Sequence, residues 1–349
     1  MRPAGRLGLF AVTAGALLAA SGAAHAQEPY YKGKTIRLII SVGVAGGFAE
    51  YARTMIMHMG KHIPGNPNMI MQSMPGAGGI IATNHMYVQA PADGTVIAMI
   101  NATAPLAPLW GSKGARFDAL KFNWIGALDR SDGTCAFWHT APAKTWDDLK
   151  KNEVTVGSIG AGSPMEVYAT MLNKLFGTRI KIIGGYTAGS DIDLAMQRQE
   201  IDGRCGTHLK SIPALHPDWI TGNKLLVPIL VSDKRNKSYP NTPALMEFVK
   251  DDATRQTIEL LTVTQKLDRP ILAPPKTPAA QVAQLRAGLA ATVRDPAFIA
   301  DLKKKRLTLD PTSGEEAVKI YTAAYASPRP VVEAVKAMMG TRERKKKGK

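Results

Sequence analysis

The chain has 349 residues, of which 45% are hydrophobic, 21% are charged and only 6% are aromatic. This length and composition suit a globular protein of two domains, and two cysteines are too few for a disulfide-rich scaffold. The formal charge of +16 fits a protein that collects anions, whereas the shortage of aromatic residues argues against nucleic acid as a partner.

The N-terminus has the pattern of a secretory signal peptide. Arg2 and Arg6 precede an uncharged stretch, Leu7 to Ala20, and Ala24-His25-Ala26 offers a cleavage site between small residues. The apolar stretch is about 14 residues long, shorter than the roughly 20 that a membrane span needs. We therefore expect cleavage after Ala26 and a periplasmic protein, with an uncleaved N-terminal anchor as the alternative.

Short apolar strands, glycine-containing loops and helices alternate in the first third of the chain. The patterns predict strands at 35–42, 69–71 and 95–100, and helices over 50–62 and from the loop 75–79 through 90. The same order returns with strands at 134–138, 154–157, 180–183 and 201–204, and helices at 145–150, 164–175 and 189–199. A strand at 225–231 leads to helices at 279–293, 296–304, 314–324 and 328–339. Residues 341–349 are rich in Lys and Arg and are expected to be a disordered, solvated tail.

This repeated order predicts two α/β units, each with parallel strands and covering helices. In such sheets a ligand lies beyond the carboxyl ends of the strands, where the glycine loops are. Two units that face each other would form a cleft.

Two loops are the sharpest candidates for binding. Ser163-Pro164-Met165-Glu166 has the residues of a capping box, and Ser158 to Gly162 before it lets backbone approach a ligand closely. Free amides at a helix N-terminus suit a carboxylate, although a merely structural cap is an equal alternative. The loop Gly43 to Phe48 has the same design after the first strand.

Signatures of nucleotide binding and of catalysis are incomplete. Gly76-Ala77-Gly78 begins a dinucleotide fingerprint, but Ile81 stands where its last glycine belongs, and no Gly-Lys-Ser/Thr follows the loop Gly43 to Phe48. Val156 replaces the first glycine of a nucleophile elbow around Ser158. We therefore expect no cofactor and no enzymatic activity, and keep a degenerate hydrolase as an alternative.

Metal and thiol chemistry leave two questions open. His58 and His62 are spaced for one helix face, but Met59 stands where a zinc peptidase has glutamate. The nearby methionines could hold Cu(I) with His58, or could simply fill the core. Cys135 and Cys205 could form a disulfide or remain two buried thiols, since their spacing does not fix their distance.

The order of these segments resembles the Bug family, the solute receptors of tripartite tricarboxylate transporters. The resemblance runs from about Tyr31 to Met339. It is carried by Ile36-Arg37-Leu38-Ile39-Ile40, Gly46-Gly47, Ala52-Arg53, Pro75-Gly76-Ala77-Gly78-Gly79, Ala90-Pro91-Ala92-Asp93-Gly94-Thr95, Val156-Gly157-Ser158, Gly162-Ser163, Tyr186, Gly189, Leu194, Ile201-Asp202-Gly203, Leu272-Ala273-Pro274-Pro275 and Thr277-Pro278.

The resemblance implies a two-domain α/β clam of the type II periplasmic-binding-protein kind, with crossover strands and a ligand cleft between the lobes. Domain 1 would comprise 27–132 with 233–340, and domain 2 would comprise 133–232. The protein would act as a monomer without a cofactor, closing on a small carboxylate (a di- or tricarboxylate, an aromatic acid or another organic acid) and delivering it to the membrane permease.

The family's contacts can be carried over motif by motif. They fall on the first loop, on the two loops of the second domain and on three weaker positions, namely Ala45, Gly46, Gly47, Phe48, Ala49 and Glu50; Ser158, Gly160, Ala161, Gly162 and Ser163; Gly185, Tyr186 and Thr187; and Asn101, Thr103 and Thr207. Family members usually carry an Asp shortly after the Gly-Gly pair. Here either Ala49 replaces that Asp or Glu50 takes its place.

Overall fold

The computed structural model describes residues 28–209 and 215–340. The predicted signal peptide, 1–26, and the basic tail, 341–349, lie outside the described residues. No helix within the described ranges is long and apolar enough to cross a bilayer.

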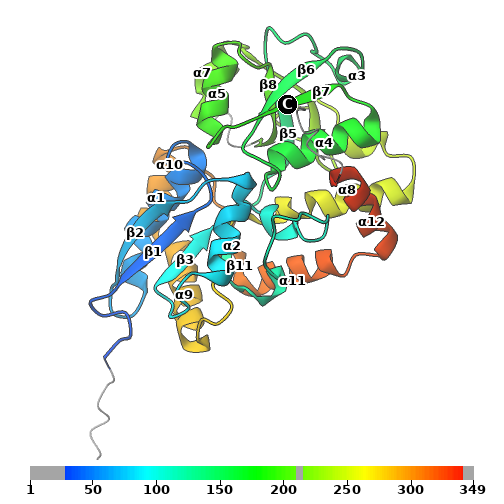
Figure 1. Cartoon of the computed structure of the whole chain (residues 1–349). Coiled ribbons are helices and arrows are strands. Elements are labelled where there is room, and N and C mark those ends of the chain that lie inside the picture. The colour runs from blue at the N-terminus through cyan, green and yellow to red at the C-terminus, as the bar shows by residue number, and fades with distance from the viewer. Residues whose placement is uncertain (1–27, 210–214, 341–349) are drawn as a thin grey trace, which may run out of the picture.

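The first sheet has six strands in the order β11-β4-β10-β3-β1-β2. Its strands β1, β2 and β3 are labelled in the lower lobe in Figure 1. β1 lies parallel to β2 and β3, whereas β10 runs antiparallel to β3 and β4, and β11 antiparallel to β4. The strands are β1 (Thr35–Ile40), β2 (Asn68–Ser73), β3 (Val96–Met99), β4 (Asn123–Asp129), β10 (Asp268–Ala273) and β11 (Thr312–Ser313).

Helices cover both faces of this sheet because successive side chains of a strand point to opposite sides. Ile36, Leu38 and Ile40 of β1 pack in one core with α1 (Gly47–Met59), α9 (Ala279–Thr292) and α10 (Pro296–Lys304). Ile39 points to the other core, which contains α2 (Ile80–Val88) and α11 (Gly314–Tyr325). Short 3₁₀ turns complete this part at η1 (Gly60–His62), η2 (Ala77–Gly79), η3 (Ala104–Leu106) and η4 (Ala119–Lys121).

The second sheet has five strands in the order β7-β6-β8-β5-β9. They are β5 (Gly133–Trp138), β6 (Val154–Ser158), β7 (Ile180–Gly184), β8 (Gly203–His208) and β9 (Leu225–Val231). β6 lies parallel to β7 and β8, and β5 runs antiparallel to β8 and β9. Side chains of α4 (Pro164–Phe176) pack in one core, and those of α5 (Gly189–Gln197) and α7 (Pro217–Thr221) in the other. α3 (Asp148–Lys151) lies between β5 and β6 in the chain.

The chain crosses between the two sheets twice. It leaves β4 at Asp129 and enters β5 at Gly133, and it returns from β9 through η5 (Leu245–Phe248), α8 (Asp252–Thr262) and η6 (Val263–Lys266) to β10. The expectation of parallel strands is therefore wrong for β5 and β9. β4, β10 and β11, which were not predicted as strands, are also paired antiparallel. The strands that these crossover segments join run antiparallel to their neighbours, because the chain enters the second lobe after β4 and returns to the first lobe after β9.

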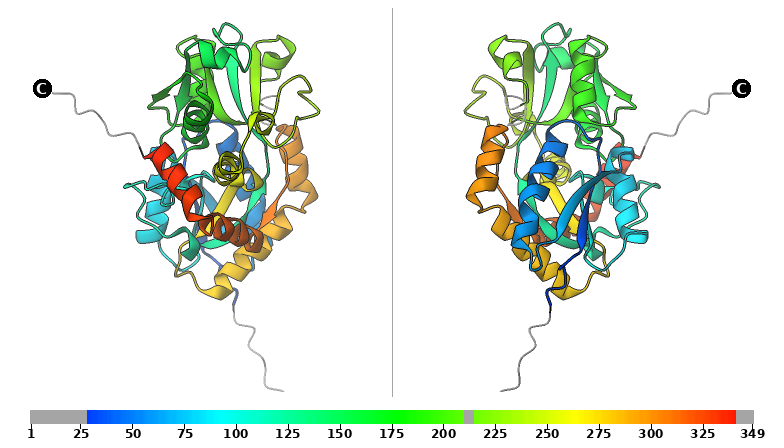
Figure 2. Two further views of the ribbon diagram at one scale, coloured as in Figure 1. Left: turned by 90° about the vertical axis from the view of Figure 1, so that its right-hand side faces the viewer. Right: turned by 90° about the vertical axis from the view of Figure 1, so that its left-hand side faces the viewer.

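The arrangement is the expected two-lobed α/β clam with crossover segments, and both side views show one lobe above the other (Figure 2). α12 (Arg329–Met339), at the end of the described chain, contacts α8 and also α4, which belongs to the second lobe (Figure 1). The boundaries proposed at 132 and 233 remain predictions.

Candidate ligand-binding site

Backbone hydrogen bonds join the two lobes directly. The Gly78 amide donates to the Ile159 carbonyl at 2.9 Å, and the Gly162 amide donates to the Ala77 carbonyl at 3.1 Å. The Thr103 hydroxyl donates to the Gly162 carbonyl at 2.7 Å. The structure is therefore a closed clam in which the loop 158–163 rests on the loop 75–79.

This close approach requires glycine on both sides. A Cβ on Gly160 would lie 2.7 Å from the Gly78 nitrogen, too close for any side chain, and Gly160 has a φ of +119°. At another point of the interface the Gly43 amide donates to the Thr187 carbonyl at 3.0 Å.

A cavity of about 90 Å³ remains between the closed lobes. Its walls come from the β1–α1 loop, the segment after β3 and the start of β10 on one side, and from α4, α5 and β8 on the other. The lining residues are Val42, Ala45, Gly46, Gly47, Phe48, Asn101, Ala102, Thr103, Thr264, Gln265, Asp268 and Arg269, with Ile159, Pro164, Met165, Tyr168, Gly189, Ser190, Arg204, Gly206, His208 and Leu215.

The N-terminus of α1 opens onto this cavity. α1 begins at Gly47, and no side chain caps it. Gly46 precedes the helix with a φ of +83°, a conformation that glycine adopts without strain. Gly46, Gly47 and Phe48 all line the cavity. The first amides of a helix and its partial positive charge favour an anion at this position.

Arg204 provides a cation from β8. Its guanidinium pairs with Asp193 of α5 at 2.5 Å, and Nε has no hydrogen-bond partner among the described residues. Asp193 is buried and lies 3.0 Å from His216 Nε2. Burial opposes its ionisation, but the charge of Arg204 and the hydrogen bonds from His216 and Arg204 outweigh burial and lower the Asp193 pKa.

Arg269 provides a second cation at the start of β10. It is only 3% exposed, stacks 3.9 Å from the centre of the Tyr51 ring and pairs with Asp268. Asp268 also lies 3.1 Å from Nε2 of His208. Burial lowers the pKa of Arg269, while Tyr51 and Asp129 act in the opposite direction. Within the described chain, Nε of Arg269 has no hydrogen-bond partner.

Six of the residues predicted from sequence line the cavity, namely Ala45, Gly46, Gly47, Phe48, Asn101 and Thr103. Ala49 and Glu50 do not. Ala49 is fully buried, and the Glu50 carboxylate pairs with Arg53 and, at 3.1 Å, with Lys305. Among the described residues, the carboxylate that lines the cavity is Asp268, which comes from β10 rather than from α1.

The remaining predicted residues are not among those that line the cavity: Ser158, Gly160, Ala161, Gly162, Ser163, Gly185, Tyr186, Thr187 and Thr207. Chain neighbours of several of them do line it, such as Ile159, Ser190 and Gly206. As ligand contacts, these nine residues stay predictions.

The capping box predicted at Ser163 forms only in part. Ser163 caps α4 by accepting the Glu166 amide, but its own amide donates to the Gly160 carbonyl at 2.9 Å. The Glu166 carboxylate instead accepts from the Ser158 hydroxyl at 3.0 Å, and the Gly160 amide donates to the same hydroxyl. The expectation of free amides in this loop is wrong for Gly160, Gly162 and Ser163, because the loop itself and the facing lobe take them up.

Four ionisable residues of the cavity wall were not predicted from sequence: Arg204, His208, Asp268 and Arg269. Arg204 and His208 lie within the strand segment Gly203–His208, where a charged side chain among small residues is the only signal. Asp268 and Arg269 stand just before an apolar run, and no local pattern marks them as ligand contacts.

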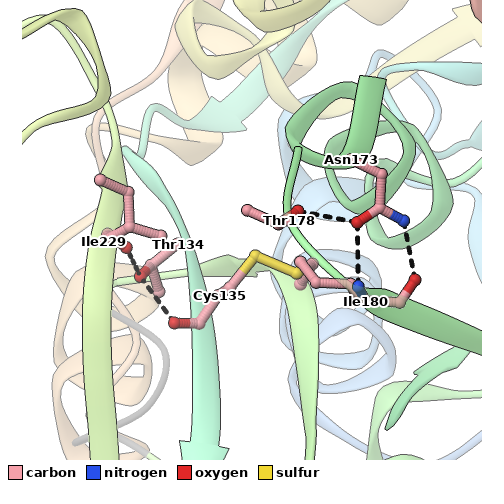
Figure 3. The surroundings of a disulfide bond; sticks show 7 residues. Thr134, Cys135, Asn173, Thr178, Ile180 and Ile229 are labelled. Carbon is pink, nitrogen blue, oxygen red and sulfur yellow. Dashed lines mark hydrogen bonds between the residues drawn. A yellow bond between two sulfur atoms is a disulfide. The ribbon is translucent and has the colours of Figure 1, made fainter. Parts of the chain in front are cut away.

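Cys135 and Cys205 are joined by a disulfide that links the adjacent strands β5 and β8 (Figure 3). Next to it, the Thr134 hydroxyl donates to the Ile229 carbonyl of β9 at 2.6 Å. Cys205 lies between Arg204 and Gly206, two residues of the cavity wall. The disulfide therefore ties down the strand that carries Arg204.

The residues that would carry the two alternative functions, copper binding and hydrolysis, are buried or already paired. Met55 and Met59 are fully buried in the core, and His58 Nε2 lies 2.8 Å from Asp301. Within 28–209 and 215–340, no three His, Cys, Asp or Glu side chains are grouped so as to hold a metal ion. Ser158 is fully buried.

Several solved structures share this fold. BugD, described as a periplasmic binding protein, matches with a TM-score of 0.69 at 20% identity, over 88% of this chain and 98% of that one. MatC from Rhodopseudomonas palustris with bound malate matches with a TM-score of 0.66 at 15% identity, over 88% and 99%. An R. palustris protein with adipate matches with a TM-score of 0.64 at 14% identity, over 88% and 97%.

No curated protein matches the chain significantly. The family model of the tripartite tricarboxylate transporter family receptor, TctC, matches residues 52–335, which is most of the chain. The chain therefore belongs to the tripartite tricarboxylate transporter receptor family.

Proposed function

We propose that this protein is a periplasmic receptor that closes on a small organic acid and presents it to the permease of a tripartite tricarboxylate-type transporter. The observation that carries the proposal is the cavity between the lobes, which brings together the uncapped N-terminus of α1 and the guanidinium groups of Arg204 and Arg269. Helix amides and guanidinium groups are the donors that carboxylates prefer in proteins.

The closed arrangement supports a hinged mechanism. A ligand that contacts both lobes stabilises the closed state by the difference between its affinities for the open and closed forms. The contacts of Gly78 with Ile159 and of Gly43 with Thr187 would form only on closure, so that closure creates a surface for the permease. The proteins with malate and adipate are consistent with a carboxylate ligand.

Three further parts of the proposal come from the sequence. The signal peptide is cleaved after Ala26, the two domains divide at about 132 and 233, and the receptor acts as a monomer without a cofactor or catalysis. The basic composition helps to gather anions at the surface.

A thermal-shift titration of the purified protein tests the proposal. Small carboxylic acids and their neutral amides are compared, because a ligand that binds only the folded state raises the melting temperature by mass action. We expect at least one acid to stabilise the protein and its amide to have no effect. Stabilisation by neutral solutes together with indifference to every acid would contradict the proposal.

A further inference from the structure

We infer that the cavity selects small monocarboxylates with a compact apolar body over di- and tricarboxylates. This inference rests on the proposed receptor function and names the ligand class. It follows from the juxtaposition of two guanidinium groups, each paired with an aspartate, with one uncapped helix N-terminus and a partly apolar wall.

The size of the cavity sets the first limit. Its volume is about 90 Å³ in the closed structure. One water molecule needs about 10–15 Å³ of such a cavity, which gives at most roughly six to nine water-sized positions. That is room for a short-chain acid.

The charge balance around Arg204 sets the second limit. Asp193 pairs with Arg204 at 2.5 Å and keeps its negative charge, since its pKa lies below the usual value. The Arg204 guanidinium can still donate hydrogen bonds, but its charge is already compensated within the protein. It therefore offers little net attraction to a second ligand carboxylate.

The positive charge of Arg269 is compensated in the same way as that of Arg204. Asp268 pairs with its guanidinium, and Asp129, which faces Asp268 across the β10–β4 ladder, is a second carboxylate near it. Arg269 is buried and lines the cavity, and its Nε has no hydrogen-bond partner among the described residues. It offers a hydrogen-bond donor, and no surplus positive charge.

The N-terminus of α1 adds the equivalent of about half a positive elementary charge. Glu50 in its first turn is itself paired with Arg53 and Lys305. One ligand carboxylate is matched by this terminus and by the donors of Arg204 and Arg269. A second would be buried without a counter-charge, which is strongly unfavourable.

The wall also has an apolar part, beside polar side chains such as Asn101, Thr103 and Gln265. Phe48 faces the cavity from the first lobe, and Met165, Tyr168 and Leu215 face it from the second. These side chains suit an alkyl chain or small ring, and they offer no charge to a second carboxylate.

The test is calorimetric titration of wild-type protein with acids matched in carbon number, pentanoate against glutarate and hexanoate against adipate. We expect each monoacid to bind at least about tenfold more tightly than its diacid. Diacids that bind as tightly or more tightly would overturn this inference and leave the receptor function intact. No binding by either series, with binding of neutral amides, would overturn both.

A variant isolates the charge effect. Asp193→Asn removes the compensating charge from Arg204, so adipate affinity should rise by about tenfold and the preference for hexanoate should fall. Asp148→Asn is the control, since Asp148 lies in the same lobe and accepts from Lys144 and Thr145 rather than from an arginine. An unchanged preference in a folded Asp193→Asn would overturn the claim that the paired arginine sets the selection, and the wild-type titration decides the matter if that variant does not fold.

Discussion

Gly78 of the first lobe donates its amide hydrogen to the carbonyl of Ile159 on the second lobe at 2.9 Å. A Cβ at Gly78 would collide with the Ser163 backbone nitrogen across this contact. We predict that Gly78→Ala hinders closure and weakens acid binding by about tenfold or more, because binding requires the closed state. Calorimetric titration measures the loss.

Gly33→Ala is the control for backbone strain. Gly33 has a φ of +70°, against +67° for Gly78, and a Cβ there would meet nothing within 4 Å. Both variants should lose stability by about 1–2 kcal/mol, the cost of a left-handed conformation for alanine. Equal acid affinity in the two variants would show that the Gly78 contact is not part of binding.

Arg204→Gln should weaken acid binding by about tenfold or more, because it removes charge-assisted donors from the cavity and removes the positive charge beside Asp193. Calorimetric titration with hexanoate measures the effect. Arg198→Gln is the control, since Arg198 is exposed and lies 3.9 Å from Glu200. An Arg204→Gln variant that binds as wild type would remove Arg204 from the site.

The Cys135–Cys205 disulfide closes a loop with a sequence separation of 70 residues. The chain-entropy relation gives a stabilisation of about 4 kcal/mol for a loop of this length. We predict that a reducing agent lowers the urea midpoint of wild type to that of the Cys135→Ala/Cys205→Ala double variant. The double variant itself should not respond to the reducing agent, and a wild-type midpoint that is indifferent to reduction would contradict the prediction.

Glu247 makes a paired contact with Arg235 at 2.7 Å, and the hydrogen bond from Arg235 lowers its pKa from 4.5 to about 2. A lowered pKa in the folded state means that the contribution to stability is present above pH 4.5 and is lost as the pH falls towards 2. Denaturant unfolding of wild type and Glu247→Gln should therefore differ at neutral pH and converge at acid pH. A difference that grows on acidification would have the wrong sign.

Sequence patterns predicted those strands and helices that are marked by their own residues. β1 is a run of β-branched and leucine residues, and α4 begins with Ser163 and Pro164, so both could be placed without knowing their neighbours. β4 and β10 were missed. Gly126 interrupts the β4 sequence, and β10 begins with the poor strand formers Asp268-Arg269-Pro270. These strands form because they pair with each other across more than a hundred residues.

The binding site could be predicted only in part, because some of its residues come together only through tertiary contacts. The glycines at 46 and 47 mark a loop where backbone meets a ligand, and that much is visible in the sequence. The role of Arg204 depends on Asp193 and on closure of the lobes, and no spacing along the chain reveals either. The amides of Gly160 and Gly162 looked free in the sequence because the contact of their loop with Ala77 and Gly78 is a tertiary one.

A crystal structure of the protein with a bound short-chain monocarboxylate tests the central claim most directly. We predict that its carboxylate lies between the first amides of α1, at Gly47 and Phe48, and the guanidinium of Arg204, with the carbon chain against Met165. A ligand bound outside the cavity between the lobes, or oriented with its carboxylate away from α1, would contradict the account.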